Sequence, residues 1–356
     1  MAEKLQLLSL NDEELKKFVC EELGEKSFRA AQIREWLNRG ATLAEMGNLS
    51  LKLRTRLGEL AIANPIAIEQ VYASKLDETE KFLYRLTDGN LIEGVVMRYH
   101  YGDTLCVSTQ VGCRMGCAFC ASTLQGRVRD LSAGEILGQV VAVNRYLREK
   151  DASRRVHNIV LMGSGEPFDN YDNVIAFLRL VNSESGLNIS LRNISLSTCG
   201  LADKIDRFSK EGLPVTLSLS LHAPNDEIRR QIMPVTKAFS YEEVMAACRR
   251  YCDLSGRRVV FEYALIRDLN CELRHADELA QKLRNLRCHV NLIPLNDVKE
   301  RNLHAPSREQ VNAFLKRLEL RHISATVRRE MGADIEGACG QLRRKVLEKM
   351  APNDKI

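Results

Sequence analysis

Apolar and polar residues follow two alternating patterns along most of this chain. From Leu105 onward, short apolar runs that are typical of buried strands alternate with stretches in which apolar residues recur at the three-to-four-residue spacing of a helix. The pattern predicts strands at 105–109, 156–162, 193–197, 215–220, 259–265, 289–294 and 323–328. It predicts helices near 132–149, 171–182, 201–210, 241–254, 273–286 and 308–320.

Capping residues support this alternation. Three of the predicted helices begin with a serine that is followed three residues later by Glu or Gln: Ser132/Glu135, Ser240/Glu243 and Ser307/Gln310. Repeated strand–helix units imply a parallel sheet. We therefore expect an α/β fold, a partial (βα)6 barrel whose ligands gather at the carboxyl ends of the strands.

The first hundred residues have a different pattern. Asn11 and Glu14 form a capping pair for a helix that Gly24 would end, and further helices are predicted from Ser27 to about Asn38 and from about Ser50 to Leu60. Two β-type runs, 81–86 and 91–97, flank the turn 88–90 and predict a hairpin. We expect four parts: a helical accessory domain, a hairpin extension, a catalytic barrel and a tail, at residues 1–64, 65–98, 99–345 and 346–356.

Composition and charge indicate where the protein acts and what it can bind. The N-terminus has no apolar signal core, and no run approaches the length of a membrane span, so we expect a soluble, cytoplasmic protein, active as a monomer and with no membrane partner. The net charge is +5, and many arginines occur in adjacent pairs such as Arg229-Arg230. By themselves these pairs favour solvated helix faces over an RNA-binding surface.

Three of the eleven cysteines, Cys113, Cys117 and Cys120, are separated by only three and two residues. Thiolates at such spacing bind iron–sulfur clusters or zinc, and three of them leave one iron of a four-iron cluster open to another ligand. A structural zinc site, with Cys106 or His222 as a distant fourth ligand, and three unrelated core cysteines are the alternatives. With no export signal, we expect reduced thiols and metal chemistry rather than disulfides.

Further candidates follow predicted strands. Gly163 and Gly165 would let the backbone approach a ligand, and Glu166 could accept hydrogen bonds from an ammonium group. Polar side chains recur at three other strand ends, where capping or turn roles are the alternative. By pattern alone, Glu93 in the second hairpin strand is expected to face solvent.

The three-cysteine loop resembles that of the radical S-adenosylmethionine (SAM) superfamily. The wider match is to the RlmN/Cfr family of RNA adenine methyltransferases, and it is carried by the segments 110–113, 163–167 and 332–342. The resemblance covers nearly the whole chain. It implies one [4Fe–4S] cluster, two SAM molecules per turnover, and an electron donor such as flavodoxin or ferredoxin.

The resemblance also implies roles for individual residues. Cys113, Cys117 and Cys120 would bind the cluster. The SAM contacts would be Gly165, Glu166, Ser197, Ser220, Leu221, His222 and Asn296. Cys339 would receive a methyl group, Glu93 would act as the general base, and Cys106 would resolve the Cys339 adduct through a disulfide.

The implied substrates are 23S rRNA and tRNA. Segments 170–173 and 326–332 look more like the enzymes that methylate adenine C2 than like the resistance branch that methylates C8. A radical SAM activase or mutase would explain the cluster but not the cysteine pair. A zinc-stabilised RNA-binding module without catalysis is the alternative from another class.

Overall fold

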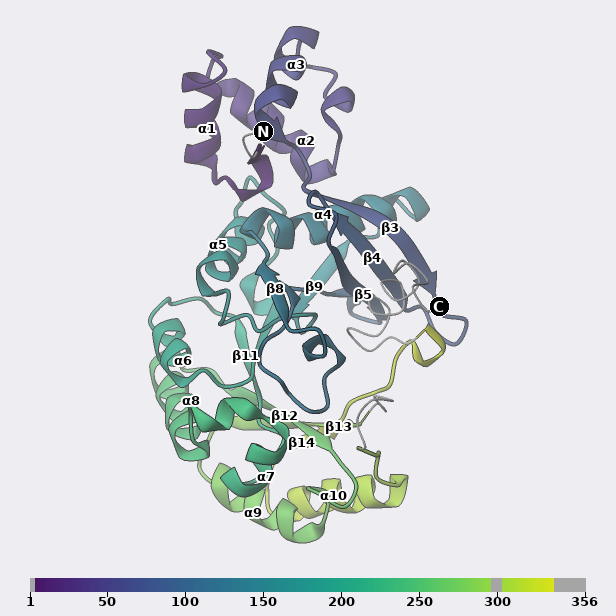
Figure 1. Cartoon of the computed structure of the whole chain (residues 1–356), viewed down its shortest axis with the longest axis vertical. Helices are drawn as coiled ribbons and strands as arrows, with labels where there is room; N and C mark the ends of the chain where they lie inside the picture. The colour runs from purple at the N-terminus through teal and green to yellow at the C-terminus, as the bar shows by residue number, and fades with distance from the viewer. Residues whose placement is uncertain (1–3, 296–302, 336–356) are drawn as a thin grey trace, which may run out of the picture.

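The computed structural model describes residues 4–295 and 303–335, and its main feature is one ten-stranded sheet (Figure 1). The strand order is β14-β13-β12-β11-β10-β9-β6-β5-β4-β3. The sheet is parallel from β6 to β14 and antiparallel from β3 to β6. The parallel part confirms the predicted partial barrel.

Strands and helices alternate through the barrel as predicted. The parallel strands are β6 (Gly102–Cys106), β9 (Val156–Leu161), β10 (Ile194–Thr198), β11 (Thr216–Ser220), β12 (Val259–Leu265), β13 (Cys288–Pro294) and β14 (Ala325–Val327). The helices are α4 (Ala133–Lys150), α5 (Tyr171–Asn182), α6 (Ala202–Ser209), α7 (Asp226–Ile232), α8 (Tyr241–Ser255), α9 (Leu273–Leu283) and α10 (Arg308–Leu320). The three predicted capping boxes are present at the starts of α4, α8 and α10.

Two differences from the prediction have local causes. The first barrel strand spans 102–106 rather than 105–109, because its pairing with β9 ends after Val107: Val107 N still donates to Val160 O at 3.0 Å, but Ser108 N donates to the Gln139 side chain. Helix α7 was not predicted, since its seven residues are too few to show a helical period.

Residues of the parallel strands alternate between two faces. Leu217 and Leu219 of β11 belong to the apolar core beneath the helices, so Ser218 and Ser220 face the opposite side, the barrel interior. The same rule puts Ser197 of β10 and Glu262 of β12 inside. The barrel interior is therefore lined by polar groups, as a ligand-binding chamber requires.

The hairpin extension is continuous with the barrel. Its strands are β3 (Ile66–Ala73), β4 (Glu80–Leu86) and β5 (Leu91–Tyr99), and β5 pairs directly with β6. The predicted turn is confirmed by the bond from Leu86 N to Asn90 O, 2.9 Å, with Gly89 at φ +84°. The third strand, β3, was not predicted, and it extends the hairpin to a three-stranded antiparallel unit.

The accessory domain forms one end of the molecule (Figure 1). It comprises β1 (Leu5–Gln6), a 3₁₀ turn (Leu7–Ser9), α1 (Asp12–Glu21), α2 (Phe28–Arg39), a second 3₁₀ turn (Leu43–Glu45), α3 (Leu51–Leu60) and β2 (Ala61–Ile62). The predicted Asn11/Glu14 capping box is present. A short parallel pairing of β1 with β2 closes the domain. In the described residues, no helix is both long and apolar enough to cross a membrane.

Candidate active site

The loop that carries the three clustered cysteines is closed at its base by a small hairpin. Strands β7 (Gln110–Gly112) and β8 (Arg127–Asp130) pair antiparallel, and Cys113 N donates to Gly126 O at 3.0 Å. Gly112 has φ +77°, and a Cβ there would lie 2.0 Å from Gly126 O. Only glycine therefore allows the two ends of the loop to meet so closely.

The three thiols of this loop interact electrostatically with one another. Cys113 and Cys117 are buried and Cys120 is partly buried. Burial raises the pKa of Cys113 to about 12 and also raises the pKa of Cys117, and the neighbouring thiols add to both shifts. The Cys113 and Cys117 thiols therefore stay protonated until a metal centre replaces the protons.

A metal centre fits the donor chemistry of this loop. Three thiols without a fourth in the same loop match a cluster that keeps one iron open. Within residues 4–295 and 303–335, no three Cys, His, Asp or Glu side chains are grouped to hold a single metal ion. The assignment of a cluster to Cys113, Cys117 and Cys120 thus rests on donor type and on their spacing along the chain.

The glycine turn after β9 packs against the chain itself. A Cβ at Gly163 would lie 2.6 Å from Val107 O, and one at Gly165 would lie 2.7 Å from Gln110 N, with Gly165 at φ +113°. The expectation that these glycines make room for a ligand is therefore incomplete. Their first effect is to let the turn lie directly on residues 107–110, which lead into the cysteine loop.

Glu166 is held at the centre of the barrel mouth. Its Oε2 accepts from Cys199 N at 2.7 Å, and its Oε1 accepts from Phe168 N at 3.1 Å. Burial raises the pKa of this carboxyl. Each carboxylate oxygen can accept more than one hydrogen bond, so both remain able to accept from a ligand ammonium group.

The predicted strand-end residues lie on neighbouring strands, but they offer different groups. Ser197 Oγ and Ser220 Oγ are 3.4 Å apart. The side chain of Leu221 is fully buried in the apolar core, so any ligand contact there must come from its backbone.

His222 lies beside the cysteine loop. Its ring contacts the Phe119 ring edge-on, with centroids 4.5 Å apart. Its Nδ1 accepts from Ala264 N at 2.9 Å, and burial together with Arg229 lowers its pKa to about 3. The ring is therefore neutral, with its proton on Nε2, the nitrogen that remains to donate to a ligand.

Glu93 is buried, which corrects the expectation of a solvent-facing carboxylate. It is 4% exposed and pairs with Lys81 Nζ at 3.0 Å, and Lys81 is itself fully buried. Val95 and Met97, which alternate with Glu93 on the same face of β5, contact Cys106 on β6. Glu93 and Cys106 thus lie on one face of the sheet.

The segment that leads to the C-terminal cysteine motif reaches this same face. Met331 packs with Val95, Met97 and Cys106. Gly332 N donates to Asp77 Oδ2 at 2.9 Å. Asp334 accepts from Ser74 Oγ at 2.6 Å and from Lys75 N at 2.7 Å. The chain is therefore fixed to the β3–β4 turn immediately before residue 336, while Cys339 and Asn296 lie outside the described residues.

A buried network links this face to the glycine turn. Ser108 Oγ donates to Glu93 O at 2.7 Å and accepts from Ser164 N at 3.0 Å. Gln139 of α4 bonds both the N and the O of Ser108, each at 2.9 Å. This network therefore fixes the relative positions of Glu93, the 163–166 turn and the start of the cysteine loop.

Sequence reasoning missed several buried polar residues. Glu262 interrupts an otherwise apolar strand run, which was a usable signal, whereas Lys81 stands at the polar start of its run and gave none. Glu262 Oε2 accepts from Asn291 Nδ2 at 3.0 Å inside the barrel. Gln139 and Arg229 lie on amphipathic helices and gave no signal, and the prediction that Arg229 belongs to a solvated pair is wrong, because Arg229 is fully buried.

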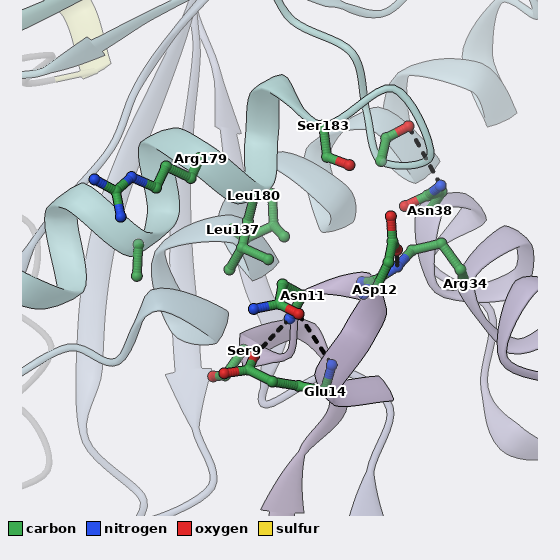
Figure 2. A pocket seen from close by; sticks show the side chains of 12 residues that line it. Ser9, Asn11, Asp12, Glu14, Arg34, Asn38, Leu137, Arg179, Leu180 and Ser183 are labelled. Atoms are coloured by element: carbon green, nitrogen blue, oxygen red, sulfur yellow. Dashed lines mark hydrogen bonds and ion pairs between the residues drawn. The ribbon is translucent and has the colours of Figure 1, made fainter. Parts of the chain in front are cut away.

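A cavity of about 340 Å³ lies between the accessory domain and helices α4 and α5, and its polar groups bond both within the accessory domain and across to the barrel (Figure 2). Asp12 pairs with Arg34 at 3.1 Å, and Asn38 Nδ2 donates to Ser185 O at 2.6 Å. Ser185 also donates to Asp12. These bonds fix the accessory domain on the barrel.

Comparison with known proteins extends these observations. A family model described as the ribosomal RNA large subunit methyltransferase N-terminal domain matches residues 5–63. The radical SAM superfamily model matches residues 107–280.

Relatives that match over nearly their whole length agree with these two family models. The chain is 50% identical to a protein of Alkaliphilus oremlandii named "probable dual-specificity RNA methyltransferase RlmN", over 97% of this chain and 99% of that protein. It is 48% identical to a protein of the same name from Lachnospira eligens, over 97% and 98%. A crystal structure of a radical SAM methyltransferase from Sphaerobacter thermophilus matches with a TM-score of 0.91 at 43% identity, over 95% of this chain and 98% of that one.

Proposed function

Because the chain belongs to the RlmN family of radical SAM RNA methyltransferases, we propose that it methylates C2 of an adenine in 23S rRNA and of an adenine next to the anticodon in tRNA. Family membership makes it a SAM-dependent enzyme with an iron–sulfur cluster. The relatives are named as dual-specificity enzymes, which supports two RNA substrates. The zinc-module alternative does not fit this family.

The observation that carries the proposal is the position of the 331–335 segment. Met331 packs against the cluster formed by Val95, Met97 and Cys106, and Gly332 and Asp334 are anchored to the extension that bears Glu93. Cys339 follows Asp334 by only five residues, so it starts from an anchor next to the other two candidate catalytic groups. A radical SAM enzyme without this chemistry would not need to anchor the 331–335 segment beside Cys106 and the extension that bears Glu93.

The residues at the barrel mouth would bind the cofactors. Cys113, Cys117 and Cys120 would hold the [4Fe–4S] cluster, which when bound supplies the electron that cleaves SAM. Glu166, with Gly165 beside it, would accept the ammonium group of SAM. The remaining polar contacts would come from Ser197, Ser220, the Leu221 backbone, His222 and Asn296.

The proposed reaction uses two SAM molecules, and each has a different role. Adenine C2 is not nucleophilic enough to take a methyl group directly from a sulfonium. Cys339 would therefore first accept the methyl group of one SAM and carry the carbon to the ring, while the second SAM is consumed as the radical source. Glu93 would then remove the ring proton, and the Cys106 thiolate would attack the Cys339 sulfur, forming a disulfide and releasing the RNA.

The parts of the chain would then have separate tasks. We assign residues 1–64 to RNA binding and residues 65–98 to the extension that carries Glu93, the proposed general base. Residues 99–345 would perform the radical chemistry, and residues 346–356 would form a tail. The substrates would be RNA in the cytoplasm, with flavodoxin or ferredoxin as the reductant and a monomer as the working form.

Nucleoside mass spectrometry tests the proposal. Anaerobically reconstituted enzyme, given SAM and a reductant, should convert adenosine to 2-methyladenosine in a 23S rRNA fragment and in tRNA. A product that is chiefly 8-methyladenosine would contradict the C2 assignment. Methylation of rRNA but not of tRNA would contradict only the proposal that tRNA is a second substrate.

The same reaction with Cys106→Ala tests the cysteine scheme. The carbon bridge between Cys339 and adenine can form in this variant but cannot be resolved, so RNA should remain covalently attached. Digestion should leave an adenosine adduct on the Cys339 peptide. Unmodified Cys339 under turnover conditions would rule the scheme out.

A further inference from the structure

One guanidinium group is completely buried under the cysteine loop. Arg229 of α7 is 0% exposed and is the largest of the fully buried side chains. Arginine keeps its positive charge even when buried. Its neighbour Arg230 is exposed and pairs with Asp226 at 3.8 Å, so the two arginines of this pair have different surroundings.

All the hydrogen-bond acceptors of Arg229 among the described residues are neutral. Its Nη2 donates to Cys199 O at 2.6 Å and to Ser220 O at 3.4 Å. Its Nη1 donates to Thr236 Oγ1 at 3.0 Å, and its Nε donates to Leu221 O at 3.3 Å. These bonds tie the ends of β10 and β11 together, but they do not neutralise the charge.

A buried charge without a counter-charge is costly, on the order of several kcal/mol for each ion. Arg34, which is also buried, shows the usual solution, because it pairs with Asp12 at 3.1 Å. Arg229 has no such carboxylate among its bonded partners. An anionic ligand bound nearby would supply the counter-charge that the bonded partners of Arg229 within residues 4–295 and 303–335 lack.

The cysteine loop lies directly against the segment that carries Arg229. Ala118 N donates to Ile232 O at 2.8 Å, and a Cβ at Gly116 would lie 3.3 Å from Pro234. Cys117 packs in one apolar cluster with Cys199, Ile232 and Met233. Because Arg229 Nη2 bonds Cys199 O and Cys199 packs in this cluster with Cys117, the guanidinium lies beside the residues that surround a proposed cluster ligand.

We infer that Arg229 is a positioning residue whose buried positive charge balances the negative charge of the iron–sulfur cluster held by Cys113, Cys117 and Cys120, and so raises its reduction potential. The inference rests on the cluster assignment in the proposed function. A cluster bound by thiolates is anionic, and the electron taken from the donor adds further negative charge. A fixed cation in a site of low dielectric stabilises the reduced form more than the oxidised form.

The reduction potential of the reconstituted cluster tests this role. It is measured anaerobically by spectroscopic titration with dithionite, without SAM or RNA, at matched iron and sulfide content. Arg229→Met should shift the potential to more negative values, whereas Arg229→Lys should stay near the parent value. Arg230→Met is the matched control at the exposed neighbour, and its potential should not change.

Thr236→Val separates charge from hydrogen bonding, because it removes one acceptor of Arg229 and leaves the guanidinium in place. It should leave the potential unchanged. An unchanged potential in Arg229→Met at full iron content would overturn the inference, and so would an equal shift in Thr236→Val. If Arg229→Met retains no cluster, iron retention decides: a loaded Arg229→Lys supports the charge role, and an iron-free Arg229→Lys overturns it.

A competing role is support of Glu166, which bonds the N–H of Cys199 while Arg229 bonds its carbonyl. In that case Arg229→Met would weaken SAM binding without changing the cluster potential, and the inference would be wrong. The potential is measured without substrate. Its outcome is therefore independent of whether the product is 2-methyladenosine.

Discussion

At the scale of single residues, the structure gives Glu93 an ionic partner. Lys81 and Glu93 lie on the paired strands β4 and β5, both nearly inaccessible to solvent. The pair fixes the orientation of the carboxylate toward the sheet face that also carries Cys106. A proposed base thus has a defined position before RNA binds.

Lys81→Met should be strongly destabilising, because it leaves a buried carboxylate without its ammonium partner. Loss of one member of a buried pair costs about 3–5 kcal/mol. Denaturant unfolding measures the change. The double variant Lys81→Met/Glu93→Gln should recover much of the stability while methylation stays lost.

The control for this comparison is an exposed ion pair. Arg56 and Glu59 are 3.0 Å apart with side chains 52% and 58% exposed. Arg56→Met should change stability by no more than about 1 kcal/mol. If Lys81→Met had an equally small effect, the buried pair would not be holding Glu93.

At the scale of elements, the turn after β9 couples two parts of the site. Residues 163–166 lie on residues 107–110, with Thr109 N and Gln110 N both donating to Ser164 O at 2.8 and 3.1 Å. Gln110 Oε1 also accepts from Glu166 N at 2.9 Å. The turn that presents Glu166 and the strand that enters the cysteine loop therefore move as one element.

Gly165→Ala should disrupt this element. The new Cβ would lie 2.7 Å from Gln110 N in a backbone conformation that alanine rarely adopts. Gly212→Ala is the matched control, because Gly212 has φ +66° and open space around it, so only the conformational cost of about 1–2 kcal/mol applies.

Two measurements distinguish these variants. Gly165→Ala should lose more stability than Gly212→Ala in denaturant unfolding, and it should also weaken SAM binding, measured by calorimetric titration. Equal losses with unchanged SAM affinity would mean that the turn tolerates a side chain and does not position Glu166.

At the scale of the whole molecule, the accessory domain and the barrel share one core. Leu7 and Leu8 belong to the same apolar cluster as Val140 of α4 and Phe177 of α5. Polar bonds such as the one from Asn38 Nδ2 to Gly186 O, 3.3 Å, reinforce this contact (Figure 2). A shared core of this kind favours cooperative unfolding over independent domain motion.

The accessory domain should therefore unfold together with the barrel. The chain has a single tryptophan, Trp36 in α2, so its fluorescence reports the accessory domain alone. Thermal transitions followed by Trp36 fluorescence and by far-UV circular dichroism should coincide. A fluorescence transition at clearly lower temperature would show that the accessory domain unfolds first.

The sequence by itself determined the local features of this protein. The capping boxes at Asn11, Ser132, Ser240 and Ser307 depend on residues three positions apart, and the structure contains all four. The strand–helix alternation depends on the spacing of apolar residues within one element. Family motifs in the sequence identified the candidate site residues and the RNA methyltransferase class, and the class is confirmed by the relatives.

The tertiary structure alone decided which distant residues meet. The burial of Arg229, the pairing of Lys81 with Glu93 and the anchoring of Asp334 on the β3–β4 turn all join segments whose contact leaves no periodic trace in the sequence. A charged residue on an amphipathic helix or strand is ordinarily solvated, so local pattern assigned Arg229 and Glu93 to the surface. Burial is set by what the rest of the chain packs against a residue, and that information exists only in the folded molecule.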